Sequence, residues 1–205
     1  MNSLLILLLL ILGYQLVRVR YQRTHIALLG QHLSNLQLEK HMEQLTQGYS
    51  RAINEKDPSR QQQILELFEQ TEQAVATQVQ TLADAMQTEN LQATRLGILP
   101  FCIPYAEQFL PFITRDFRQL LHIHAQGLRY VVQNEAGWDK KSRAYHLSAE
   151  LYLLQHSCHW FCKSRTVADA RLLVRHQVQY QKVVDSVSEL TRLAYQQWLQ
   201  DTKKQ

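Results

Sequence analysis

The densest group of potentially reactive side chains is the stretch HSCHWFC, residues 156–162, which holds two histidines and two cysteines. If this stretch is helical, successive residues advance about 100° around the helix axis. Cys162 then lies about 40° and His159 about 100° from Cys158, whereas His156 lies about 160° away on the opposite side. Thiolate and imidazole groups bind zinc and copper, so the three side chains on the shared arc could form part of a metal site.

Two further histidines occupy or border apolar faces of neighbouring predicted helices, and they could complete a metal site or a haem pocket if those faces meet. The candidate metal ligands are therefore Cys158, Cys162, His159, His124 and His176. The alternative is structural, because cysteine is among the most buried residue types and Cys158 continues the apolar series that begins at Leu147. The CxxxC spacing is also not a zinc-knuckle spacing.

Sequence signatures of catalysis are missing from the chain. It has no glycine-rich phosphate loop and no G-x-S-x-G, H-E-x-x-H or C-x-x-C motif. The three tryptophans, Trp138, Trp160 and Trp198, are too scattered to form a base-stacking platform. We therefore expect a protein that is not an enzyme, has no cofactor and does not bind nucleic acid.

The strongest signal in the chain is the apolar segment LLILLLLILGYQLV, residues 4–17, in which eleven of the residues are Leu, Ile or Val and none is charged. These residues favour membrane insertion by about 3 to 7 kcal/mol. A helix over residues 1–19 is roughly 28 Å long, which is just sufficient to cross a bilayer. We predict a signal anchor over 1–19, whose membrane-anchoring residues are Leu4, Leu8, Leu12, Leu16, Arg18 and Arg20.

The alternative is a cleaved signal peptide, which needs basic residues before the apolar run and a cleavage site with small residues after it. Neither feature is present here. Basic residues instead follow the apolar segment at Arg18, Arg20 and Arg23. By the positive-inside rule, residues 20–205 should then lie in the cytoplasm, on the inner side of the cell (inner) membrane. A reducing compartment also agrees with an odd number of cysteines, three.

The rest of the chain is predicted to be all-α. Of 205 residues, 45% are hydrophobic and only six are Gly and four Pro, which favours long helices with a packed core. Asp57 followed by Pro58 is a helix start signal, Thr166 with Asp169 is a candidate capping box, and Gly97 is a candidate C-cap. The sequence predicts an antiparallel bundle of four to five long helices, coiled-coil-like in their apolar seams, at about residues 18–48, 59–96, 104–135, 143–163 and 167 to near the C-terminus.

The connector GILPFCIPY, residues 97–105, is unusually apolar. If the helices run antiparallel along the membrane normal, the first carries the chain about 45 Å away from the bilayer and the second returns it by about 57 Å. This connector would then lie at the membrane surface, together with Lys163 and Arg165. The alternative is that it closes the open end of the core.

The leading functional hypothesis is a non-enzymatic interaction or scaffold module at the cytoplasmic face of the membrane, with a protein partner or a second copy of itself. Its basis is the anchor, the long apolar seams and the lack of catalytic motifs. The first alternative is a metal- or haem-binding bundle that uses the Cys158/Cys162 pair. The second is a lipid-surface sensor that acts through the connector 97–105. The net charge of +4 permits an anionic membrane surface as a partner without requiring it.

Overall fold

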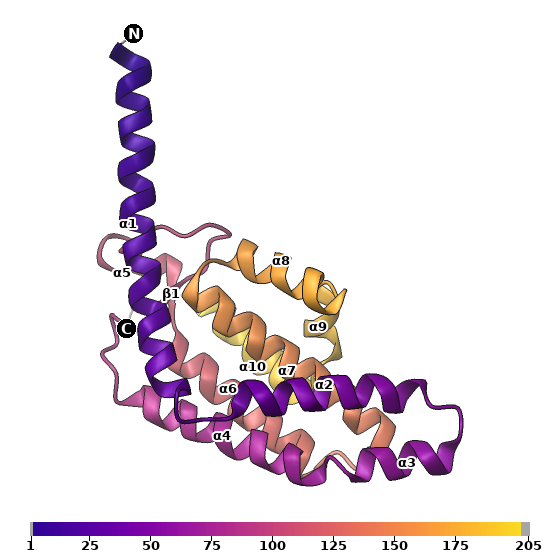
Figure 1. Cartoon of the computed structure of the whole chain (residues 1–205). Coiled ribbons are helices and arrows are strands. Elements are labelled where there is room, and N and C mark those ends of the chain that lie inside the picture. The colour runs from indigo at the N-terminus through magenta and orange to yellow at the C-terminus, as the bar shows by residue number, and fades with distance from the viewer. Residues whose placement is uncertain (1, 202–205) are drawn as a thin grey trace.

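The computed structural model describes residues 2–201, and the protein is mostly helical, with 77% of its residues in helices and 3% in strands. Helix α1 (Asn2–Leu33) rises out of a helical body formed by the rest of the described chain (Figure 1). Leu4, Leu8, Leu12 and Leu16 are all exposed on it, and none of its most apolar stretch is buried in the protein. This helix is therefore long and apolar enough to cross a membrane.

The first predicted helix of the body is broken in two. Helix α1 ends at Leu33, a four-residue turn follows, and α2 (Leu38–Asn54) crosses the body in another direction (Figure 1). The prediction of one helix to about residue 48 was wrong. In a single continuous helix, the apolar residues before the turn and those after it would lie on different faces. The turn lets α1 bury Leu29 while α2 buries Leu45 and Tyr49.

The second predicted helix, 59–96, is also divided. It consists of α3 (Pro58–Glu66) and α4 (Glu69–Gln87). The predicted start is confirmed, since the Asp57 carboxylate accepts hydrogen bonds from the backbone N–H groups of Ser59 and Arg60. The predicted end is wrong, because Arg95–Gly97 forms a short strand, β1, that pairs antiparallel with β2 (Thr114–Asp116). Gly97 is therefore a strand residue and does not cap a helix.

The third predicted helix, 104–135, starts later than expected. The chain first forms a single helical turn, α5 (Ala106–Phe109), and a 3-10 turn, η1 (Pro111–Ile113), before β2. Helix α6 (Phe117–Val132) then begins with Asp116 as its N-cap. Pro111 therefore marks a later start of the helix and does not kink it.

The fourth predicted helix is confirmed closely as α7 (Lys140–Cys162). The fifth is instead three helices: α8 (Arg165–His176), α9 (Tyr180–Ser186) and α10 (Glu189–Gln200). Gln177 ends α8 in a left-handed conformation with φ of 55°, and Ser188 caps α10. The predicted capping box was displaced by two residues, since Ser164 caps α8.

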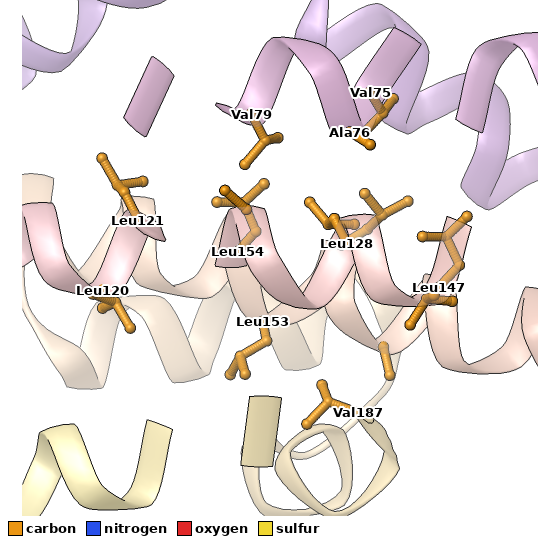
Figure 2. Packing of buried hydrophobic residues seen from close by; sticks show 14 of the residues in the cluster. Val75, Ala76, Val79, Leu120, Leu121, Leu128, Leu147, Leu153, Leu154 and Val187 are labelled. Carbon is orange, nitrogen blue, oxygen red and sulfur yellow. The ribbon is translucent and has the colours of Figure 1, made fainter. Parts of the chain in front are cut away.

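Helices α6 and α7 lie at the centre of the core. Figure 2 shows Leu121 and Leu128 of α6 close to Val79 of α4, with Leu154 of α7 beside them. On the other side, Leu153 of α7 points toward the part of the chain that contains Val187. The stretch HSCHWFC forms the last turns of α7, so a central helix of the core fixes its position.

Candidate functional site

The side chains of HSCHWFC divide between two sides of α7. Cys158, His159 and Cys162 line a groove, as their predicted shared arc requires. His156 is buried on the other side, where its Nε2 lies 2.7 Å from the Asp169 Oδ1 of α8. The prediction that His156 stands apart from the other three is confirmed.

The groove has a volume of about 360 Å³, which is within the range of small-molecule binding sites. Its walls come from the second half of α1, the turn before α2, the first half of α2, and the facing sides of α7 and α8. About half of the side chains are apolar or sulfur-containing, namely Ile26, Leu29, Leu33, Leu36, Leu38, Met42, Leu154, Cys158 and Cys162. The polar contributions come from Glu39, Glu43, Thr46, Tyr152, Gln155, His159, Arg175 and His176.

One wall of this groove carries a positive field. The Arg171 guanidinium Nη1 lies 3.1 Å from the His159 Nδ1. Burial, together with the charges of Arg171 and Arg175, lowers the pKa of His159 to about 4, so its imidazole is neutral at physiological pH. Burial and Arg175 also lower the pKa of His176, whose Nε2 lies 2.7 Å from Gln155 Oε1. A further cation would be unfavourable here, and an anion would be stabilised.

The two cysteines of the groove are free thiols. Burial, and the proximity of Cys162, raise the pKa of Cys158 far above its ordinary value. Burial raises the pKa of Cys162 to about 11. Both groups are therefore protonated near neutral pH, and neither is an activated nucleophile or a preformed thiolate ligand.

The five candidate metal ligands are not brought to one place. Four of them line the groove, but His124 is fully buried between α6 and α7, where its Nε2 lies 2.9 Å from Ser157 Oγ. Burial, with a smaller contribution from His156, lowers the pKa of His124 to about 3. Within residues 2–201, no three His, Cys, Asp or Glu side chains are grouped so that they could hold a metal ion.

A second feature is the surface of the body beside α1. The Tyr14 hydroxyl donates a hydrogen bond of 2.8 Å to the Cys102 carbonyl oxygen, and the Tyr21 hydroxyl donates one of 3.0 Å to Glu107 Oε2. The Gln22 side chain donates to the Lys163 carbonyl oxygen at 3.2 Å. The apolar connector therefore lies against the end of the apolar segment 4–17 of α1, and the turn between α7 and α8 lies against the residues just after it.

Three phenylalanines are largely exposed in this region: Phe101 is 60%, Phe109 is 76% and Phe112 is 64% exposed. We call the segment 98–113 with these three residues the phenylalanine surface. Arg165, which was expected beside the connector, does not point outward with these phenylalanines. Its guanidinium lies over the rings of Trp160 and Tyr180.

A buried carboxyl group on α7 was not expected from the sequence. Glu150 is fully buried, and its Oε1 accepts hydrogen bonds from the Ser188 N–H at 3.0 Å and the Ser188 hydroxyl at 2.7 Å. Burial raises the pKa of this carboxyl to about 7. Only the tertiary structure shows this site, because a glutamate within an amphipathic helix has no sequence signature of burial.

The structure thus has two separate features: an apolar groove with a positively charged wall, and the phenylalanine surface next to a membrane-length helix. The thiols and the imidazole of His159 in the groove are neutral near pH 7. No protein-family model matches the chain, and no curated protein or solved structure is found to be similar to it.

Proposed function

We propose that the protein is a single-pass membrane protein whose body, an antiparallel helical bundle, lies on the cytoplasmic face of the cell (inner) membrane and acts as a non-enzymatic interaction or scaffold module. The observation that carries this proposal is the exposed apolar part of α1, with the phenylalanine surface beside the point where α1 joins the body. A soluble protein seldom exposes so large a contiguous apolar surface. The cytoplasmic position is supported by Arg18, Arg20 and Arg23.

A docking role is supported by apolar side chains on the outer helices. Leu173 and Val174 of α8, with Leu190 and Leu193 of α10, are exposed, and Val174 is 83% exposed. A protein partner or a second copy of the chain would cover such side chains.

Orientation is tested by replacing Val174 with cysteine in the full chain and labelling with a membrane-impermeant maleimide. We expect labelling only after the cells are permeabilised. A Ser3→Cys variant is the matched control and should be labelled in intact cells, because the two residues lie on opposite sides of the membrane. Labelling of Val174→Cys in intact cells would overturn the cytoplasmic placement.

A bis-maleimide added to the same membranes should give a dimer if α8 is the self-association face, and only monomer otherwise.

A second proposed function, contact with lipid through the connector 97–105, is favoured by the exposure of Phe101 and by the Tyr14–Cys102 hydrogen bond. Aromatic side chains beside a membrane anchor are well suited to the bilayer interface. Here the membrane is itself the partner, and the basic residues near the span would favour anionic lipids.

This lipid contact is tested with Phe101→Trp in liposomes that contain brominated phosphatidylcholine. We expect the added tryptophan to be quenched strongly. The control is Tyr145→Trp, an exposed site near the start of α7, which should be quenched little. Equal quenching of the two added tryptophans would contradict the lipid contact without affecting the anchor.

A further inference from the structure

One wall of the groove is formed by α1, the helix that also carries the apolar segment. Ile26, Gly30 and Leu33 of α1 line the groove. Val19 precedes Ile26 by seven residues, so the two lie on the same face of α1. The groove therefore begins about two helical turns beyond the end of the apolar segment, with Arg23 one turn before Ile26.

The groove has a cavity volume of about 360 Å³, and apolar side chains of α1, α2 and α7 line it. A flexible hydrocarbon chain in the groove would bury its methylene groups against these side chains, which favours its binding.

The charges around the groove favour an anionic head on one wall. Arg171 and Arg175 of α8 are the charged side chains that act on His159. Glu39 and Glu43 lie on the opposite wall, formed by α2, where they would repel an anion. A carboxylate would therefore be stabilised against α7 and α8, with its chain among Leu154, Met42 and the neutral thiols.

We propose that this groove binds a single-chain anionic amphiphile from the bilayer, a long-chain fatty acid, with its chain between α1, α2 and α7 and its carboxylate facing Arg171 and Arg175. The neutral imidazole of His159 is able to donate a hydrogen bond to the carboxylate. This site is distinct from the phenylalanine surface and goes beyond a role in membrane attachment.

The test uses the full chain in phosphatidylcholine nanodiscs with hexadecanoate that carries a photoreactive group at the end of its chain. After illumination, labelled peptides are identified by mass spectrometry. We expect the label on the groove segments of α1, α2 or α7, and we expect unlabelled hexadecanoate to compete at least tenfold better than hexadecanol.

Gly30→Phe fills the groove, since a Cβ at Gly30 meets no atom within 4 Å and the residue lines the site. Labelling of the groove should fall at least tenfold in this variant. The matched control is Gln31→Phe, which places the same side chain at the next, exposed residue and should label as the wild type does. The double variant Arg171→Gln with Arg175→Gln should remove the preference for hexadecanoate over hexadecanol.

Three results would overturn the inference: label confined to residues 4–19 and the phenylalanine surface, equal labelling of Gly30→Phe and wild type, or equal competition by hexadecanol. Co-elution of the protein with nanodiscs is measured in the same samples. A loss of co-elution would instead indicate failure of the proposed membrane anchor, so the two outcomes are separable. Thermal unfolding of each variant shows whether the fold is retained.

Discussion

At the residue scale, the least ordinary group is the buried carboxyl of Glu150. It accepts two hydrogen bonds from Ser188, yet burial outweighs them and raises its pKa to about 7. Gly127 of α6 leaves room for this cluster, because a Cβ there would come within 2.8 Å of Glu150 Oε2 and still closer to the Thr191 hydroxyl. Glu150 therefore couples folding to pH, because its affinity for a proton is higher in the folded chain than in the unfolded chain.

We expect Glu150→Gln to weaken the pH dependence of stability. The folded carboxyl titrates near pH 7 and the unfolded one near pH 4.5, so the folded state binds the extra proton between these values. The stability that the protonated group provides is fully present below pH 4.5 and is lost as the pH rises through 7. The loss is about 3 kcal/mol at most. Glutamine stays neutral and keeps an acceptor oxygen for Ser188.

The measurement is the free energy of unfolding of the full chain in detergent micelles, with denaturant, at pH 5 and pH 8. The free energy of unfolding of Glu150→Gln minus that of the wild type should be larger at pH 8 than at pH 5. A variant-to-wild-type difference that does not change between the two pH values would show that Glu150 titrates normally in the folded protein.

At the scale of elements, most helical segments could be predicted from the sequence, but the breaks that divide them into shorter helices could not. The Asp57 cap and the bounds of α7 follow from local signals. The break between α3 and α4 does not, because it depends on contact with α2. There, Gly48 allows the ring of Phe68 to pack against the α2 backbone. Likewise, the end of α8 depends on Gln177 in a left-handed conformation, which the sequence does not indicate since glycine is the usual residue there.

We expect Gly48→Ala to destabilise the protein by about 1 to 3 kcal/mol. The new Cβ would clash with the Phe68 ring, so the ring must move, although alanine favours the helix by about 1 kcal/mol. The control is Gly30→Ala, which meets open space and should be neutral or slightly stabilising. Adding Phe68→Leu to Gly48→Ala should restore part of the loss. Unchanged stability in Gly48→Ala by denaturant unfolding would show that the two helices do not pack this closely.

At the scale of the whole molecule, the geometry from which the membrane-surface position of the apolar connector was predicted is wrong, and that position stays a prediction. The body helices were expected to run alongside α1, whereas α2, α3 and α4 run across the body (Figure 1). The connector nevertheless contacts α1, since the Tyr14 hydroxyl donates to the Cys102 carbonyl oxygen and the Tyr21 ring packs against Tyr105. The groove could be predicted only in part: helical periodicity placed Cys158, His159 and Cys162 on one face, but the walls from α1 and α2 depend on the turn after Leu33.

The central prediction is that the apolar part of α1 stays attached to the body and remains in the membrane. The direct measurement is the intact mass of the protein recovered from membranes after extraction at alkaline pH. We predict that the chain stays in the membrane pellet with the full mass of 24.1 kDa. A shortened chain that begins after Arg20, released into the soluble fraction, would contradict the account.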